Sequence, residues 1–307
     1  MNRHFLTVAS LSADELAALL DRADALKADR AAGRGVRDDL AGRSVGMIFE
    51  KPSTRTRVSF EVGLAELGAR PVVLSAAELQ LGRGETVEDT AAVLSRYLHG
   101  LVVRTFAQSR LDALAEAGTV PVINALSDHA HPCQALADLQ TIRERLGGLR
   151  GRRLCYLGDG NNVAHSLLEA GALAGMDVVV AHPEGYAPDP GVLEAAGRIA
   201  SGTGGSVSAT TDAAAAAAGA DVLYTDVWAS MGQEAEAEAR AASFAPYRLD
   251  RRALDAAADG ALVMHCLPAH RGEEISAEAM DGPSSVVWDQ AENRLHAQKA
   301  LLLELLS

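Results

Sequence analysis

The stretch SVGMIFEKPSTRTRVSFEVGLAELGARPVVLS, residues 44–75, holds the pattern that decides the fold. It begins and ends with short apolar runs, residues 44–50 and 70–75, which are typical of buried strands. Between them Phe60, Leu64 and Leu67 recur at helical spacing. A strand, a helix and a second strand in succession form the unit from which parallel sheets are built. The stretch therefore predicts an α/β protein.

The junction between the first strand and the helix, PSTRTR at residues 52–57, is rich in donors and positive charge. A helix N-terminus leaves about four backbone N–H groups unpaired and carries about half a positive charge, which favours a phosphate. Hydroxyl groups and the guanidinium of Arg55 add further donors. A capped helix start with solvated arginines is the alternative at this point. The junction lacks the Gly-x-x-x-x-Gly-Lys pattern of a P-loop.

Composition narrows the class of protein. A length of 307 residues favours two domains over one. The formal net charge of -13 argues against nucleic acid or an anionic membrane as the main partner. The N-terminus resembles no secretory signal, and no apolar run reaches the roughly 18 residues that cross a bilayer. Three cysteines in no metal-ligand spacing fit a reducing cytoplasm.

The remaining apolar runs continue the alternation of strands and helices. Further strands are predicted at residues 100–106, 120–125, 153–160, 177–183, 221–228, 261–268 and 285–290. Helices are predicted over residues 13–29, 132–146, 213–218 and 292–306, the first opened by a Ser12–Glu15 capping box. The glycine pair at 147–148 marks a boundary between two α/β domains.

Chemically capable side chains follow several of these strands. Arg104 ends one of them, Asp226 follows another, and Cys266 follows a third. Ligands collect at the carboxyl edge of open parallel sheets, where such residues lie. His131 and Gln134 stand at a helix start and can hydrogen-bond a carbonyl oxygen. Taken singly, each of these residues has an ordinary structural reading, and for Cys266 that of a small buried hydrophobe is the more usual.

The turn GDGNN, residues 158–162, raises an alternative function. It resembles the first turn of a dinucleotide-binding fold, which would make the protein a nicotinamide-dependent dehydrogenase. However, Val163 stands where the third glycine of that motif belongs. Asn161 and Asn162 can instead bind a polar substrate or simply form the turn. A phosphate-binding module without catalysis is a further alternative.

Seven motifs in the same order resemble the aspartate and ornithine carbamoyltransferase family, and within it the ornithine branch. They are STRTR at 53–57, RTF at 104–106, HPCQ at 131–134, GDGNN at 158–162, DVWASMG at 226–232, HCLP at 265–268 and NRLHAQKA at 293–300. The resemblance covers nearly the whole chain. It implies two α/β domains, each a parallel-sheet sandwich, at residues 1–147 for carbamoyl phosphate and 148–290 for ornithine. It also implies that residues 291–307 form a C-terminal helix that returns to the first domain.

The resemblance also implies site residues. Carbamoyl phosphate would contact Ser53, Thr54, Arg55, Thr56, Gln80, Arg104, His131, Gln134, Cys266, Leu267 and Arg294. L-Ornithine would contact Asn162, Asp226, Ser230 and Met231, with Asn161 left open as a further contact. Catalysis would fall to Cys266, Asp226, Arg104 and His131. The chemistry requires no metal and no cofactor.

The implied reaction gives L-citrulline and phosphate in arginine metabolism, with biosynthesis as the expected direction and catabolism as the alternative. Putrescine or acetylated ornithine are alternative acceptors, although DVWASMG favours free ornithine. The family forms homotrimers or multiples of trimers. We expect small-molecule substrates, no nucleic acid, no membrane and a cytoplasmic location.

Overall fold

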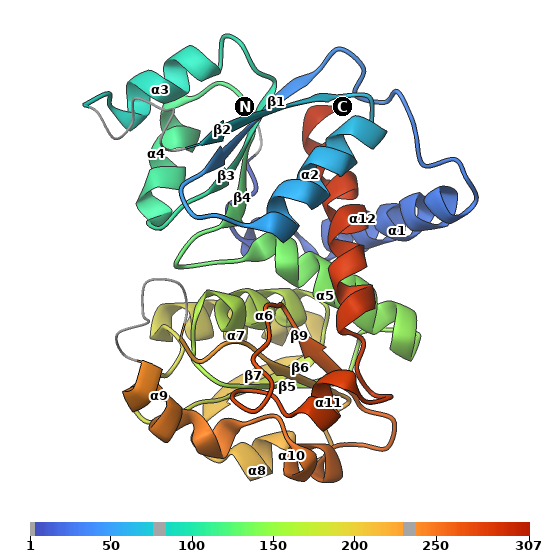
Figure 1. The fold of residues 1–307 in the computed structure, drawn as a ribbon, viewed down its shortest axis with the longest axis vertical. Helices are drawn as coiled ribbons and strands as arrows, with labels where there is room; N and C mark the ends of the chain where they lie inside the picture. Colours follow the sequence, from blue (N-terminus) through green and yellow to red (C-terminus); the bar gives the residue numbers. More distant parts are fainter. Residues whose placement is uncertain (1–3, 76–83, 230–236) are drawn as a thin grey trace. The chain divides into compact units, whose positions relative to one another are not determined.

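The computed structural model describes residues 4–75, 84–229 and 237–307 (Figure 1). The chain divides into two compact units, one of residues 1–137 and 292–307, the other of residues 138–291. We call these unit 1 and unit 2. Each has its own parallel sheet with helices packed on it, which confirms the predicted fold class.

The sheet of unit 1 has four parallel strands in the order β2-β1-β3-β4. Their bounds are β1 Ser44–Phe49, β2 Arg70–Ser75, β3 Gly100–Arg104 and β4 Val122–Leu126. β1 pairs with β2 on one side and β3 on the other, so the strand, helix and strand of residues 44–75 form as predicted. Arg104 ends β3, which is two residues shorter than expected, and therefore lies at the carboxyl edge of the sheet.

The helices of unit 1 bury one face each against this sheet or against one another. They are η1 Val8–Ser10, α1 Ala13–Ala31, α2 Thr54–Glu66, α3 Val87–Leu94 and α4 Gln108–Ala117. The capping box that Ser12 and Glu15 form opens α1, as the sequence predicts. Ile48 and Val103 pack with apolar residues of α3 and α4 in one buried cluster.

The sheet of unit 2 has five parallel strands in the order β7-β6-β5-β8-β9. Their bounds are β5 Arg153–Leu157, β6 Asp177–Ala181, β7 Ser206–Thr210, β8 Val222–Thr225 and β9 Leu262–His265. The helices are α6 Asn162–Leu173, α7 Pro190–Thr203, α8 Ala213–Ala217, α9 Ala237–Phe244, η4 Ala245–Tyr247, α10 Arg251–Ala256 and α11 Ala277–Asp281. β8 and β9 are adjacent, with Thr225 opposite His265. Residues that follow these two strands are therefore neighbours.

Two long helices, α5 Pro132–Leu146 and α12 Val287–Leu306, contribute residues to both units. From Glu292 onward α12 belongs to unit 1. There the fully buried Lys299 Nζ donates to Glu66 of α2 at 2.7 Å. Arg22 of α1 also pairs with Glu304 at 3.3 Å. The prediction that the C-terminal helix returns to the first domain is confirmed.

Two element predictions need correction. Residues 285–290 are not a strand: Ser285 makes only an isolated bridge to Val263, and α12 begins at Val287. The apolar pair Val286–Val287 is buried as a strand would be, but Val286 directly precedes the helix and Val287 is its first residue. No strand was predicted at β7, because its residues Ser206–Thr210 are mostly small or polar and lie half-exposed at the edge of the sheet.

Candidate active site

The PSTRTR junction is a helix start with a side-chain cap. Ser53 is the N-cap of α2, and its Oγ accepts the backbone N–H of Thr56 at 3.3 Å. The side chains of Thr54 and Arg55 are exposed, whereas that of Thr56 is buried. A helix N-terminus with an exposed guanidinium beside it attracts an anion.

His131 lies among positive charges in the same unit. Its imidazole is buried, and burial holds the pKa of His131 well below its usual range. The positive charges of Arg294, Arg104 and Arg55 lower this pKa further. Unit 1 therefore combines a neutral imidazole with three guanidinium groups. A ligand with several negative charges, such as a phosphate ester or acyl phosphate, suits this field.

Arg294 connects three helices of unit 1 by hydrogen bonds. One terminal nitrogen donates to Gln134 Oε1 of α5 at 2.9 Å, and the other donates to Thr56 Oγ1 of α2 at 3.0 Å. All three side chains are at most 3% exposed. Residues distant in the sequence thus meet at the start of α2.

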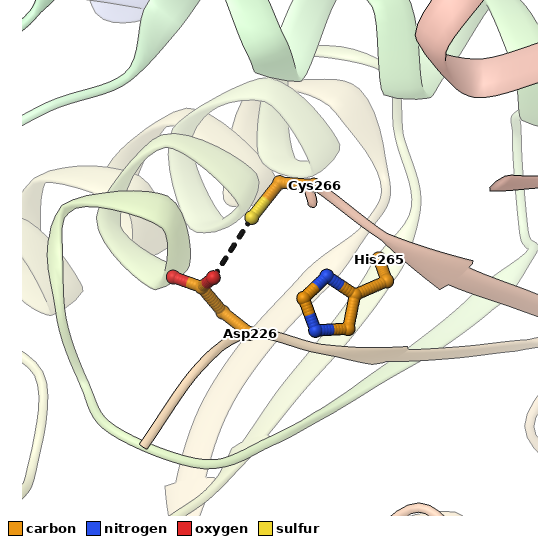
Figure 2. A group of neighbouring side chains, drawn as sticks. All are labelled: Asp226, His265 and Cys266. Atoms are coloured by element: carbon orange, nitrogen blue, oxygen red, sulfur yellow. Dashed lines mark hydrogen bonds between the residues drawn. The ribbon is translucent and has the colours of Figure 1, made fainter. Parts of the chain in front are cut away.

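In unit 2 an acid and a thiol face one another (Figure 2). Asp226 follows β8, and Cys266 follows the adjacent strand β9. The Cys266 thiol donates to Asp226 Oδ1 at 2.9 Å, and the Val227 N–H donates to the same oxygen at 2.8 Å. Asp226 is 6% exposed. A buried acceptor beside a thiol can hold an amine and accept its proton.

Asn161, the neighbour of the predicted Asn162, is the asparagine that contacts this acid. Its Nδ2 donates to Asp226 Oδ2 at 3.0 Å, while its Oδ1 accepts the N–H groups of Val163 and Ala164. It is the N-cap of α6, and Asn162 is the first residue of that helix. The sequence predicts a contact from Asn162 and leaves Asn161 open as a further one, because adjacent residues of a turn look alike until the cap is known.

The dinucleotide alternative fits this turn poorly. In that fold, the N–H groups at the helix start face a pyrophosphate. Here Asn161 Oδ1 already accepts two of them. Asp159 is bound by Arg240, although burial raises the pKa of Asp159. The turn orients the amide of Asn161 toward Asp226.

His265 supports the turn that carries Cys266. Its Nδ1 accepts the backbone N–H of Leu267 at 2.9 Å, so the proton is on Nε2, which lies 3.2 Å from Glu274 Oε1. Leu267 has φ of 60°, in the left-handed region that few residues other than glycine adopt. The bond to His265 stabilises this conformation. The HCLP motif was recognised from the sequence, but the role of its histidine was not.

Among the described residues, two groups of side chains have metal-ligand atoms within 4.8 Å of one another. They are Asp226, His265 and Cys266, and His270, Glu273 and Glu274. In the first group both nitrogens of His265 already have hydrogen-bond partners. A metal on either nitrogen would displace one of those bonds. The group fits a hydrogen-bonded acid and thiol better than a coordination shell.

A further cation near the PSTRTR junction was missed. Lys51 stands just before it, is 7% exposed, and donates to Asp128 at 2.5 Å. Its Nζ also lies 4.0 Å from the centre of the Phe106 ring. Its position next to an expected phosphate site was the available signal.

The predicted residues thus fall into two groups. Unit 1 brings together Ser53, Thr54, Arg55, Thr56, Arg104, His131, Gln134 and Arg294. Unit 2 holds Asn162, Asp226, Cys266 and Leu267. Gln80, Ser230 and Met231 lie outside the described residues.

Two family models cover the chain. Residues 3–144 match "Aspartate/ornithine carbamoyltransferase, carbamoyl-P binding domain", and residues 150–305 match "Aspartate/ornithine carbamoyltransferase, Asp/Orn binding domain". The part of the chain that the structure describes has no helix long and apolar enough to span a membrane.

Similar proteins agree with the two models. The ornithine carbamoyltransferase of Parafrankia sp. (strain EAN1pec) is 65% identical over 304 residues, 99% of this chain and 96% of that protein. The ornithine carbamoyltransferase of Acidothermus cellulolyticus is 60% identical over all of this chain and 97% of its own length.

Solved structures are similar over the same length. Ornithine carbamoyltransferase from Pyrococcus furiosus has a TM-score of 0.96 at 51% identity, covering 99% of this chain and 97% of that one. An acetylornithine transcarbamylase complexed with acetylcitrulline has a TM-score of 0.89 at 31% identity, with 99% of each chain covered. With both of its units matched, this chain is a carbamoyltransferase and belongs to the aspartate/ornithine carbamoyltransferase family.

Proposed function

We propose that this enzyme transfers the carbamoyl group of carbamoyl phosphate to the side-chain amine of L-ornithine, giving L-citrulline and phosphate. The observation that carries the proposal is the pair of the Asp226 carboxylate and the Cys266 thiol in the unit that matches the Asp/Orn binding model. A carboxylate suits an amine, whereas a second substrate carboxylate, as in aspartate, requires basic side chains. Identities of 60–65% to ornithine carbamoyltransferases support the same acceptor.

The phosphate of carbamoyl phosphate would bind at the start of α2. Ser53, Thr54 and Arg55 would donate to the phosphate oxygens, while Thr56 at the same helix start would donate to the carbonyl oxygen of carbamoyl phosphate. Arg294 would hold Thr56 and Gln134 in place. Phosphate then leaves with the electron pair of the broken C–O bond. The helix N-terminus and Arg55 would stabilise the charge of this leaving group.

The carbonyl oxygen gains negative charge when the amine attacks. Arg104, His131 and Thr56 would stabilise that charge, and losing one such donor typically costs about 10²–10³ in rate. Because burial and the arginines keep His131 neutral, its ring would donate one N–H without carrying a charge of its own.

Ornithine presents an ammonium group at neutral pH. An alkyl amine has a pKa of about 10.4, so freeing its lone pair at pH 7 costs about 4–5 kcal/mol. Asp226 would orient the amine and take up its proton, and Cys266, bonded to Asp226, would assist that transfer. After attack on the carbonyl carbon, the nitrogen passes a second proton to the departing phosphate, and the urea group of citrulline forms.

In the proposed enzyme, residues 1–147 would form the carbamoyl phosphate-binding domain, residues 148–290 the ornithine-binding domain, and residues 291–307 the returning helix. Gln80, Cys266 and Leu267 would also contact carbamoyl phosphate. Asn162, Ser230 and Met231 would contact ornithine. We further propose a biosynthetic role, a cytoplasmic location and assembly as a homotrimer.

A product assay with a panel of acceptors tests the proposal. The purified enzyme is given carbamoyl phosphate with L-ornithine, N-acetylornithine, putrescine or L-aspartate, and ureido product is measured. We expect kcat/KM for L-ornithine to exceed that of every other amine by about 10²-fold or more. The site would bind groups of L-ornithine that acetylation blocks and that putrescine or L-aspartate lacks. A higher kcat/KM for N-acetylornithine would instead indicate that the chain has the activity named for the acetylornithine transcarbamylase to which it is similar.

A further inference from the structure

A buried hydrogen-bond network lies behind the acid and the thiol in unit 2. It consists of Asp138 on α5, Tyr224 on β8 and Gln290 on α12, each at most 1% exposed. We call it the 138–224–290 network. Gln290 Nε2 donates to Asp138 Oδ1 at 2.7 Å and to the Tyr224 hydroxyl at 3.0 Å. The Tyr224 hydroxyl in turn donates to Asp138 Oδ2 at 3.2 Å.

The network ends on the backbone of the site. Gln290 Oε1 accepts the N–H of His265 at 3.0 Å, and His265 is the residue before Cys266. On the adjacent strand, Tyr224 is two residues before Asp226. The network therefore connects the strand that leads to the thiol with the strand that leads to the acid.

The backbone N–H of His265 fixes which way the Gln290 amide points. This N–H can only donate, so it must face the amide oxygen of Gln290. The NH₂ group is then directed to Asp138 Oδ1 and to the Tyr224 hydroxyl. Burial and the nearby Asp138 raise the pKa of Tyr224, so its hydroxyl remains a donor. Each bond in the network thus has one allowed direction.

We propose that Asp138 and Gln290 are positioning residues, which hold the turn after β9 so that the Cys266 thiol stays in hydrogen-bond contact with the Asp226 carboxylate. The effect of this positioning on turnover rests on the proposed function, but its effect on the Cys266 thiol does not. Neither residue needs to touch a substrate.

The alkylation rate of Cys266 by iodoacetamide, measured without substrates, reports on the thiol directly. Cys133 and Cys155 are fully buried, and burial raises the pKa of each to about 12, so they react slowly. In the wild type, Cys266 donates its proton to Asp226 and so presents less thiolate to the reagent. Loss of positioning should free the thiol.

We expect Asp138→Asn and Gln290→Met each to raise the alkylation rate of Cys266 about threefold or more, because the pair with Asp226 loosens. The exchanged variant Asp138→Asn with Gln290→Glu keeps a donor facing an acceptor and keeps the total charge. It should return the rate to within about twofold of the wild type, as coupled sites do in a double-mutant cycle. A purely structural loss of packing would not be rescued by this exchange.

A matched pair of tyrosine variants guards against misfolding. Tyr224→Phe deletes only the network hydroxyl, whereas Tyr247→Phe deletes a hydroxyl that donates to Thr211 O at 2.8 Å elsewhere in unit 2. Only Tyr224→Phe should raise the alkylation rate. In the citrulline assay, Asp138→Asn should lower kcat while leaving KM for carbamoyl phosphate within about twofold.

Wild-type alkylation rates in folded Gln290→Met and Tyr224→Phe would overturn the positioning role, whatever the activity. Failure of the exchanged variant to restore the rate, although folded, would also count against it. Conversely, absence of citrulline formation in the wild type would overturn the proposed function and leave the alkylation result intact.

Discussion

At the scale of single residues, positive side chains gather in one place although the net charge of the protein is negative. The chain has a formal net charge of -13, yet Arg55, Arg104 and Arg294 surround the neutral His131 in unit 1. In unit 2 the Asp226 carboxylate accepts from a thiol, an amide and a backbone N–H. One unit thus offers donors to an anion, and the other offers an acceptor to an amine.

The first prediction at this scale concerns the phosphate. Arg55→Ala should weaken carbamoyl phosphate binding by about 10²-fold, because a charge-assisted bidentate contact is lost at an exposed helix start. Calorimetry measures the affinity. Arg57→Ala, whose guanidinium faces Glu61 at 3.4 Å, is the control and should bind as the wild type does. If Arg55→Ala bound carbamoyl phosphate as tightly as Arg57→Ala and the wild type do, Arg55 would not be part of the site.

The second prediction concerns the amine. Asp226→Asn should raise KM for ornithine and lower kcat, with a loss of about 10²-fold or more in kcat/KM, because the acceptor for the ammonium proton is gone. Steady-state kinetics at saturating carbamoyl phosphate provide the test. Asp177→Asn is the control. It removes a carboxylate at the opposite edge of the same sheet, where Asp177 accepts a hydrogen bond from Ser206 at 2.6 Å. Unaltered ornithine saturation in Asp226→Asn would place the amine site elsewhere.

At this scale, much of the arrangement of the candidate site residues was predictable from the sequence, because reactive side chains follow apolar runs and parallel strands end at one edge. Asp226 and Cys266 were expected there, and the structure brings them to 2.9 Å. The contact of Asn161 with Asp226 was not predictable, since it depends on which of two adjacent asparagines caps α6. The bond from His265 to Leu267 also depends on backbone geometry that no pattern reveals.

At the scale of elements, short turns decide how the strands present these residues. Gly160, in the turn before α6, lies against the loop that contains Pro188. A Cβ at Gly160 would come within 2.2 Å of Pro188 N and 2.4 Å of Ala187 C, both backbone atoms. No side chain can therefore be accommodated without moving that loop.

This close approach yields the third prediction. Gly160→Ala should lower the free energy of unfolding by about 1–3 kcal/mol, because the loop must shift to relieve the overlap. Gly202→Ala, in α7 with no heavy atom within 4 Å of the added Cβ, should be neutral or stabilising by up to about 1 kcal/mol. Urea unfolding of the two variants beside the wild type provides the comparison. Equal stabilities would show that the loop yields without cost.

Element prediction succeeded where apolar periodicity was strong and failed where it was not. The segment 44–75 and the C-terminal helix have long apolar faces and fold as expected. β7 is a short edge strand with a polar sequence, so it has no apolar pattern to detect. Residues 285–290 contain two adjacent valines that fit a strand as well as a helix turn, and tertiary packing decides between them.

At the scale of the whole molecule, buried histidines link stability to pH. Burial is the largest cause of the depressed pKa of His131, and it also lowers the pKa of His296 to about 4. Between the folded pKa and the unfolded value of about 6.5, the unfolded chain binds protons that the folded chain does not. The stabilisation is therefore complete above pH 6.5 and is lost as the pH falls below it.

The fourth prediction follows from this loss of stability as the pH falls. From pH 7.5 to 5.5 each such histidine should lower the free energy of unfolding by about 1 kcal/mol. Urea titrations at the two pH values measure the change. In His296→Gln the drop should be smaller than in the wild type by about that amount. An equal drop in both proteins would show that His296 does not contribute to the pH dependence.

The central claim is that the carbamoyl carbon passes from phosphate to the side-chain nitrogen of ornithine. The most direct measurement follows ¹³C-labelled carbamoyl phosphate by NMR in the presence of ¹⁵N-labelled L-ornithine and the enzyme. We expect a new ureido carbon coupled to the side-chain nitrogen, with one phosphate released for each citrulline formed. Label recovered only as the products of carbamoyl phosphate hydrolysis, or attached to the α-nitrogen, would contradict it.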